Sequence, residues 1–140
     1  MVLKWLRRLA GLGDETDGTT TETGRRAEQA AARHLRRNGY RILTRNFHTR
    51  RGEIDIIAFR DGTVAFVEVR SLTRPAMGDP LDTINRGKQR HIVQAAREYC
   101  TAHGLYNEQI ALRFDVVAVT LDQGGRPEQV RHVVNAFEAP

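Results

Sequence analysis

The stretches GEIDIIAF (residues 52–59) and VAFVEVR (residues 64–70) decide the fold of this 140-residue chain. Each is an apolar strand pattern with an acid set into it, and the sequence RDGT (residues 60–63) between them predicts a hairpin turn. Folding of this hairpin brings Asp55 and Glu68 onto neighbouring strands. Because a buried carboxylate is costly unless it is paired or holds a cation, two acids at one place indicate a divalent-metal site.

Two helices are predicted from apolar periodicity, one on each side of the hairpin in sequence. The first covers residues 25–38, and its buried stripe is expected to contain Ala27, Ala30, Ala31 and Leu35. The second covers residues 84–102, and its inward face is expected to contain Ile84, Ile92, Ala95, Ala96 and Tyr99. The segment between the hairpin and the second helix, residues 71–80, has two prolines and a glycine and is predicted to be a loop.

Strands complete the pattern and predict an α/β protein with one mixed sheet. They are expected at residues 40–47, 53–59, 63–70, 111–120 and 129–134. The order is therefore helix, three strands, helix, strand, strand. The first three strands suit an antiparallel meander, and the second helix is long enough for a crossover to a parallel strand.

The composition predicts a single globular domain preceded by a tail. Residues 1–12 interleave apolar and basic residues, which fits either a docking segment or a frayed terminal appendage. Residues 13–23 have no large apolar residue and predict a flexible linker, so the domain is placed at residues 24–140. Basic residues inside the first apolar stretch argue against a signal peptide, and no run is long enough to cross a membrane.

Charge and cysteine content limit the cellular setting. The net charge is +5 and the isoelectric point is about 10.1, which suits a polyanionic partner such as nucleic acid or simply maintains solubility. Cys100 is the single cysteine, so no internal disulfide forms, and a packed thiol in the reducing cytoplasm is expected. Among 22 basic residues only two are lysines, and Lys88 is the lysine of the domain proper.

The acids of the hairpin predict metal-assisted phosphodiester chemistry. Asp55 and Glu68 are expected to bind Mg²⁺ or Mn²⁺, while Glu28 in the first helix lies where it can complete the metal shell. Alternation predicts Glu53, Asp55 and Ile57 on one face of the strand, with Ile54 and Ile56 on the other.

Nearby cations fit the same chemistry. Arg70 follows Glu68 on its face and supplies charge but cannot act as a base, whereas Lys88 begins the second helix and can reach the acids. The alternative is structural: Asp55 or Glu68 forms an ion pair with Arg70, Glu28 is a helix-terminus acid, and Lys88 is solvated.

A set of motifs occurs in order along the chain. These are GRRAE (24–28), NGY (38–40), RN (45–46), GEID (52–55), FVEVR (66–70), Lys88 and RFDVV (113–117). In this set the chain resembles the YraN-type family of uncharacterised bacterial proteins, which is similar to archaeal Holliday-junction resolvases of the restriction-endonuclease-like superfamily. The resemblance covers about residues 24–137 and implies a three-layer α-β-α nuclease core, DNA as partner and a homodimer. Independently of the resemblance, no membrane partner and no small-molecule cofactor are expected.

The resemblance also implies roles for particular residues. The superfamily signature is an Asp followed by Glu-x-Lys on the next strand, so Asp55 and Glu68 take the places of the two acids. The carbonyl of Val69 is then an expected metal ligand, and Glu28 matches the first-helix acid of the resolvases. Arg70 stands where the nuclease lysine belongs. Lys88 is the expected replacement, as in relatives where the lysine has moved to a helix, and the competing interpretation is a protein that binds without cutting.

Two further expectations concern the other polar residues. Phosphate contacts are expected from arginines near helix starts and in loops, namely Arg25, Arg26, Arg50, Arg51, Arg74 and Arg86. Aromatic residues make up only 6% of the chain, which favours backbone recognition of duplex or branched DNA over base stacking. Asp115 is expected to be a structural acid that pairs with Arg113 or a neighbouring strand.

Overall fold

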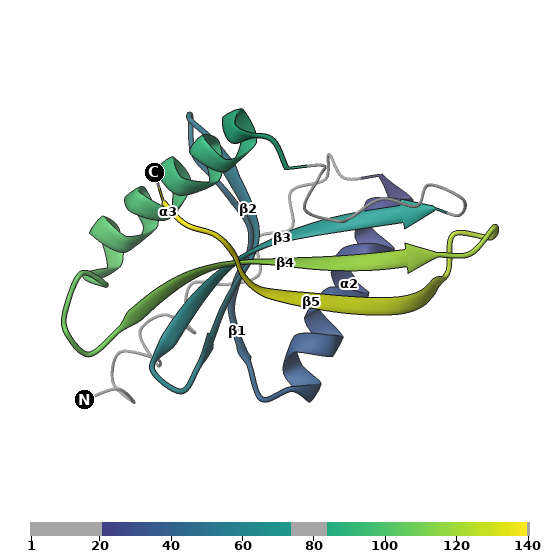
Figure 1. Cartoon of the computed structure of the whole chain (residues 1–140), viewed down its shortest axis with the longest axis horizontal. Helices are drawn as coiled ribbons and strands as arrows, with labels where there is room; N and C mark the ends of the chain where they lie inside the picture. The colour runs from purple at the N-terminus through teal and green to yellow at the C-terminus, as the bar shows by residue number, and fades with distance from the viewer. Residues whose placement is uncertain (1–20, 74–83, 140) are drawn as a thin grey trace.

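A computed structural model describes residues 21–73 and 84–139 of the chain (Figure 1). Residues 1–20, Arg74 and most of the predicted 71–80 loop lie outside this described part. Two helices and five strands follow one another in the order αβββαββ. They are α2 (Glu22–Arg37), β1 (Arg41–His48), β2 (Glu53–Arg60), β3 (Thr63–Thr73), α3 (Arg86–His103), β4 (Ala111–Leu121) and β5 (Pro127–Phe137).

The five strands form one mixed sheet in the sequential order β1-β2-β3-β4-β5. The pairs β1–β2, β2–β3 and β4–β5 are antiparallel, whereas β3 and β4 pair in parallel over eleven residues each. The predicted meander and crossover are therefore confirmed, with α3 as the connection between the two parallel strands. The β2–β3 turn consists of Asp61 (φ 49°) and Gly62 (φ 77°), the left-handed pair that suits a tight hairpin.

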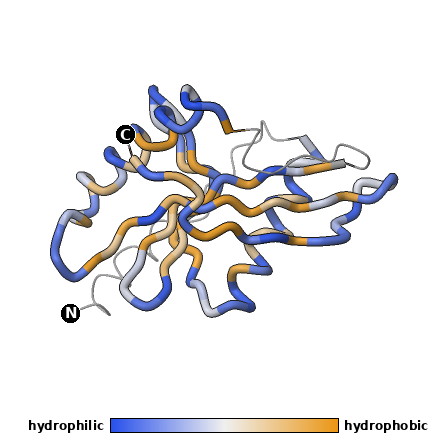
Figure 2. The backbone as a smooth tube through the Cα atoms, in the orientation of Figure 1, coloured by the Kyte–Doolittle hydropathy of each residue, from blue (hydrophilic) through white to orange (hydrophobic). Residues whose placement is uncertain are grey.

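The helices lie on opposite faces of the sheet, which gives three layers (Figure 1). On one face α2 covers the "α2-side core", built from helix alanines, Leu35 and strand residues such as Ile56, Val67 and Val117. On the other face α3 covers the "α3-side core", which contains Ile57, Phe66, Tyr99 and Phe114. Figure 2 shows the hydrophobic colour along the strands and hydrophilic colour at the turns. The predicted α/β fold is confirmed.

The helix ends differ slightly from the predicted ends because of their caps. Thr21 caps α2 by accepting a hydrogen bond from the Gly24 N–H, so this helix begins three residues earlier than predicted. Asn85 caps α3 through the Lys88 N–H, so this helix begins at Arg86 rather than residue 84. Gly104 ends α3 in the left-handed conformation.

Other local predictions need correction. The predicted loop begins later, because β3 continues through residues 71–73 in its long pairing with β4. The last strand is also longer than predicted and covers residues 127–137, since it pairs with most of β4. Ala30 is half-buried and packs against the α2-side core instead of belonging to it, contrary to its predicted place in the buried stripe. Within the described residues, neither helix has the length and apolar character needed to cross a membrane.

Candidate active site

The candidate site lies where strands β2 and β3 separate. Their antiparallel pairing ends with Ile56 opposite Val67, so Asp55 and Glu68 are the next two residues of the register. The expected alternation is wrong here: Ile54 packs with Ile57 in the α3-side core, while Ile56 lies in the α2-side core. The strand therefore changes its facing at Asp55, and the two acids meet in a fork between the strands.

Asp55 bridges this fork with its own carboxylate. Its Oδ2 accepts a hydrogen bond of 2.7 Å from the Val69 N–H of β3, in place of a ladder bond between backbones. The pKa of Asp55 lies well above its ordinary value, first because of burial and second because of the charge of Glu68. The Val69 bond opposes this rise without cancelling it. A cation placed between the two acids would offset the burial cost and the repulsion of their negative charges.

Glu68 is the more buried of the two acids, with 5% of its surface exposed. Its Oε1 lies 2.7 Å from the Lys88 Nζ and 3.7 Å from the Arg70 Nη1. Lys88 reaches Glu68 from the first turn of α3, with 41% of its side chain exposed. The structure thus brings together Asp55, Glu68, Arg70 and Lys88, and it also contains the ion pair between Glu68 and Arg70 that the structural alternative predicts.

Glu28 lies in α2, on the face of the sheet opposite to α3, and its charge acts on both acids of the fork. It is buried, and burial is the main reason why its pKa is raised. A side-chain hydrogen bond with Asn46 and the charge of Arg45 lower that pKa, whereas the charges of Glu53 and Glu68 raise it further. The sequence motif contained Arg45 and Asn46, but nothing in their pattern indicated that they contact Glu28.

The donor set of the fork fits a hard divalent cation, although with fewer protein ligands than a closed site. Two carboxylates and a backbone carbonyl at Val69 are oxygen donors of the kind that Mg²⁺ and Mn²⁺ bind, with water filling the remaining positions. In the described ranges, no three His, Cys, Asp or Glu side chains converge as a metal-binding group. Glu28 therefore does not form a three-acid group with Asp55 and Glu68, although its charge acts on both of them.

The arginines expected to bind phosphate fall into two groups. Arg25 and Arg26 both pair with Glu22 in the first turn of α2, and Arg26 also donates to the carbonyls of Gly124 and Gly125. These bonds engage both side chains within the protein itself. Arg74 lies outside the described residues.

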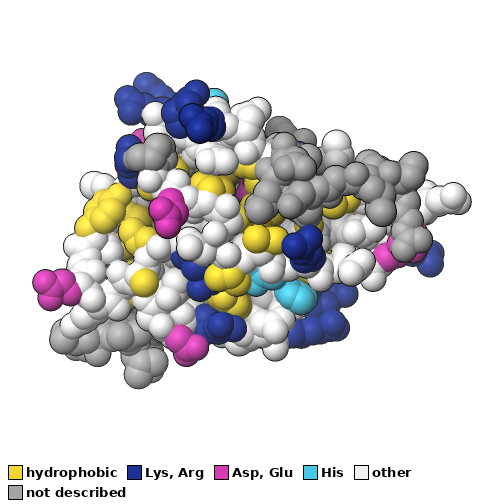
Figure 3. Space-filling view, viewed as in Figure 1, with side chains coloured by type: hydrophobic (Ala, Val, Ile, Leu, Met, Phe, Trp, Pro, Cys, Tyr) yellow, Lys and Arg dark blue, Asp and Glu magenta, His cyan; other side chains and the backbone are white. Residues whose placement is uncertain are grey.

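The second group consists of Arg50, Arg51 and Arg86, which are exposed. A side chain on Gly52 would collide with the backbone oxygen of His91, so the turn at residues 49–52 packs directly on α3. Figure 3 shows Lys and Arg side chains gathered at the top of the view, over this turn and the N-terminal half of α3. The "basic face" is defined as Arg50, Arg51, Arg86 and Arg90, all exposed.

Asp115 belongs to a separate buried network on the α2 side of the sheet. Arg113 donates two hydrogen bonds of 2.8 Å to its carboxylate, and the Asn135 N–H donates a third of 2.9 Å. His132 Nε2 lies 2.8 Å from Asp115 Oδ2, and Arg113 also donates to the Tyr40 hydroxyl. The expected pairing of Asp115 with Arg113 is present, and among the described residues the side-chain hydrogen bonds of this network do not reach Asp55, Glu68 or Lys88.

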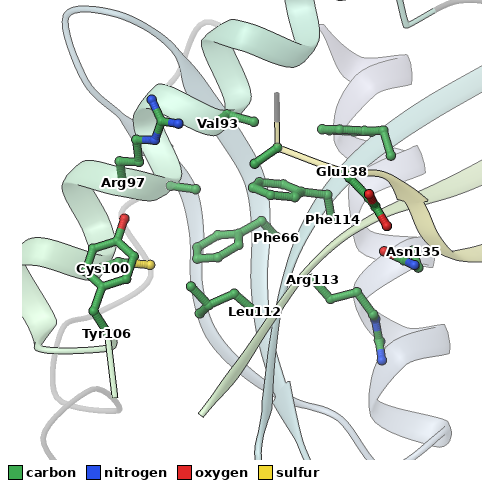
Figure 4. Close-up of a pocket in the computed structure, with 13 residues that line it drawn as sticks. Phe66, Val93, Arg97, Cys100, Tyr106, Leu112, Arg113, Phe114, Asn135 and Glu138 are labelled. Carbon is green, nitrogen blue, oxygen red and sulfur yellow. The ribbon is translucent and has the colours of Figure 1, made fainter. Parts of the chain in front are cut away.

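A cavity of about 380 Å³ lies between α3 and the strands β4 and β5. Its centre is apolar: Figure 4 shows the rings of Phe66 and Phe114 in the middle, with Cys100 and Tyr106 on the helix side. Of the predicted site residues that the structure describes, none lines it. The cavity therefore lends no support to catalysis, and the fork is the place where the chemistry-bearing side chains meet.

Comparison with known proteins agrees with the motif analysis. The family model of "Uncharacterised protein family UPF0102" matches residues 27–119. The chain belongs to this family. Its UPF0102 relatives include a protein of Anaeromyxobacter dehalogenans strain 2CP-C, 45% identical over 91% of this chain and 92% of the relative. Proteins of Anaeromyxobacter sp. strain Fw109-5 (43% identical; 81% and 84%) and Myxococcus xanthus DK1622 (42%; 84% and 90%) are similar.

The UPF0102 match contains every residue of the fork. It begins one residue before Glu28 and continues past Asp55, Glu68 and Lys88. The resemblance to a YraN-type family of uncharacterised proteins is thus confirmed at the family level. Since the names of these UPF0102 proteins state no activity, the function has to be argued from the geometry of the fork.

Proposed function

We propose that this protein is a metal-dependent endonuclease that hydrolyses phosphodiester bonds in DNA. The observation that carries the proposal is the fork, where Asp55 and Glu68 meet on neighbouring strands and Lys88 lies 2.7 Å from Glu68. Two adjacent carboxylates beside a lysine supply the groups that such hydrolysis needs: ligands for a hard cation and a positive charge near the reacting phosphate.

Asp55, Glu68 and the Val69 carbonyl are the residues that would hold Mg²⁺ or Mn²⁺. When bound, such a cation lowers the pKa of water and offsets the negative charge that develops on the phosphate. The Val69 N–H fixes one oxygen of Asp55, which leaves its other oxygen for the cation. Burial of Glu68 limits its movement, so the protein holds the pair of acids in place before any ligand arrives.

Lys88 and Arg70 differ in what they can contribute. A guanidinium does not act as a proton donor or acceptor at usable pH, so Arg70 supplies only charge, whereas an amine such as that of Lys88 is chemically able to do both. If Glu68 held a cation, the Lys88 ammonium would be free to orient water or to face a phosphate oxygen. Lys88 then takes the role of the lysine in the nuclease signature, whose sequence position is occupied by Arg70 in this chain.

The basic face provides the expected contact for the DNA backbone. Arg50 and Arg51 lie in a turn packed on the same helix that carries Lys88, so phosphate bound there lies close to the fork. Arginine contacts with phosphate carry little sequence information, so we propose recognition of duplex or branched DNA by shape, with affinity that falls steeply with salt. A homodimer and a cytoplasmic location are further parts of this proposal.

A second function is favoured by one specific observation. Glu68 is already neutralised by Lys88 and Arg70 in the structure, so the fork is charge-compensated without a metal. A protein that binds DNA through the basic face without cutting it would need no more than this. Metal-dependent cleavage separates the two functions.

The test is cleavage of labelled duplex, flap and four-way-junction DNA with Mg²⁺ or Mn²⁺. We expect cutting by the wild type and its loss, by about 100-fold or more, in Asp55→Asn and Lys88→Ala. Asp61→Asn is the matched control, because Asp61 is an exposed acid of the same hairpin and asparagine tolerates its left-handed backbone. Tight binding without cutting under either metal would replace the nuclease by the binding protein.

A further inference from the structure

Asn46 occupies an unusual place in strand β1. Its φ of 53° is left-handed, although it lies inside a strand. In the β1–β2 register Arg45 is opposite Ile56 and Phe47 is opposite Ile54, which places Asn46 across from Asp55. A left-handed residue costs energy in a strand, and such residues often occur at functional sites.

Strand β1 changes the direction in which its side chains face at Asn46. The side chains of Arg45 and Asn46 are thereby directed toward α2. Arg45 pairs with Ile56, which lies in the α2-side core, whereas Phe47 packs against the α3-side core. Asn46 forms a side-chain hydrogen bond with Glu28, and the charge of Arg45 acts on the same carboxylate. The Arg45 Nε is also buried without a hydrogen-bond partner among the described residues.

A second left-handed asparagine shows that this side-chain contact is not a general consequence of the backbone. Asn135 in β5 has nearly the same φ, 54°, but bonds Asp115 through its backbone N–H. Left-handed φ alone explains why asparagine is suitable at both positions. It does not explain why the Asn46 side chain engages an acid that faces the fork.

We propose that Asn46 is a positioning residue that holds Glu28 as an outer-sphere carboxylate of the divalent-cation centre, and that Arg45 contributes its charge to the same site. This inference rests on the proposed function. Glu28 acts electrostatically on Asp55 and Glu68 but does not form a three-acid group with them. In this role Glu28 would accept hydrogen bonds from water that hydrates a bound cation, and its orientation would set how well it does so.

Asn46→Gly is the variant that isolates the side chain. Glycine adopts a positive φ without strain, so the backbone at this position is kept while the bond to Glu28 is lost. Asn135→Gly is the matched control, because it makes the same change at the same φ and leaves the backbone N–H that bonds Asp115. Thermal melting of each variant checks that the fold is retained.

The measurement is Mn²⁺ binding to the full chain by calorimetry and by electron paramagnetic resonance, without DNA. We expect Asn46→Gly and Glu28→Gln each to weaken binding by about 10- to 100-fold, as loss of outer-sphere partners does. The double variant should be no weaker than Glu28→Gln alone, because both changes remove one interaction. Arg45→Gln should weaken binding in the same direction and Arg45→Lys should restore most of it. Asn135→Gly should bind like the wild type.

The outcomes separate this inference from the function on which it rests. If the wild type binds Mn²⁺ and Asn46→Gly binds it equally well, the positioning role is refuted while the metal centre stands. Additive losses in the double variant would also refute it. If the wild type binds no Mn²⁺, the metal centre itself is wrong, and the outer-sphere role is wrong with it.

Discussion

Replacing Asp115 by asparagine tests how much the buried network contributes to stability. The Asp115 side chain is fully buried and accepts two hydrogen bonds from Arg113 and one from the Asn135 N–H, with His132 Nε2 at 2.8 Å. Asparagine offers one oxygen, and its NH₂ group would face donors. It also leaves the Arg113 charge without its carboxylate. Loss of one partner of a buried pair costs about 3–5 kcal/mol, and we expect a decrease of this size in the unfolding free energy.

The assay is urea unfolding of wild type and Asp115→Asn at pH 7, analysed for midpoint and slope. Asp122→Asn is the control, because Asp122 accepts bonds from the Gly124 and Arg126 N–H groups through a single oxygen that asparagine retains. The control should change stability by no more than about 0.5 kcal/mol. A loss of less than about 1 kcal/mol in Asp115→Asn would refute the reasoning that the network stabilises the fold.

The difference in unfolding free energy between wild type and Asp115→Asn should also depend on pH in a defined direction. Burial raises the pKa of Asp115, but the hydrogen bonds with His132, Arg113 and Asn135 outweigh burial, so the pKa lies below its ordinary value. A carboxyl group with a depressed pKa stabilises the fold above its unfolded pKa, and this stabilisation is lost as the pH falls through the folded pKa. The difference between wild type and Asp115→Asn should therefore narrow below about pH 4.

Three further predictions concern the fork, the basic turn and the thiol. In EDTA above neutral pH, Asp55→Asn should stabilise the protein by about 1 kcal/mol, because it removes a charge that burial and Glu68 disfavour, and Mn²⁺ should abolish this gain by stabilising only the wild type. Gly52→Ala should lower the unfolding free energy by about 2 kcal/mol or more in urea, since its Cβ would meet the His91 backbone. Burial raises the Cys100 pKa from 9.0 to about 11, so its reaction with Ellman's reagent at pH 8 should be about 100-fold slower than in the unfolded chain.

For each of these three predictions, a specific outcome would contradict it. A less stable Asp55→Asn in EDTA would show that its bond with Val69 outweighs the repulsion between the acids. Gly124→Ala is the control for Gly52, because among the described residues its Cβ would first meet the Asp122 side chain, at 3.4 Å, and equal losses at both glycines would remove the packing argument. A native thiol that reacts as fast as the unfolded one would mean that Cys100 is accessible.

The sequence was informative where local chemistry determines structure. The Asp61–Gly62 pair specifies a tight turn, and a tight turn fixes the register that places Asp55 across from Glu68. Apolar periodicity likewise placed both helices, because a buried helix face repeats every three to four residues. The helix ends were displaced by only a few residues, since capping depends on one side chain.

The arrangement of side chains around Asp55 and Glu68 is harder to predict from the sequence, because it depends on contacts between residues that are distant in the chain. Strict alternation failed at Asp55, where the carboxylate itself bonds a neighbouring strand. Nothing in the local sequence distinguishes Asn46 from an ordinary strand residue, although its backbone decides which side chains face Glu28. The engagement of Arg26 by Gly124 involves residues 98 positions apart, and no periodic pattern reports such a contact.

The parallel pairing of β3 with β4 has a consequence for the kinetics of folding. It joins Thr63 to Ala111, so the chain must close a long loop containing all of α3 before the pairing forms. The β2–β3 hairpin closes through two residues and should form much earlier. Asp55 and Glu68 therefore come together before Lys88 reaches them from α3, and in the nascent hairpin the two mutually repelling charges have Arg70 but not Lys88 as a counter-ion. Refolding should accordingly be faster in Asp55→Asn than in the wild type, because the substitution removes that repulsion.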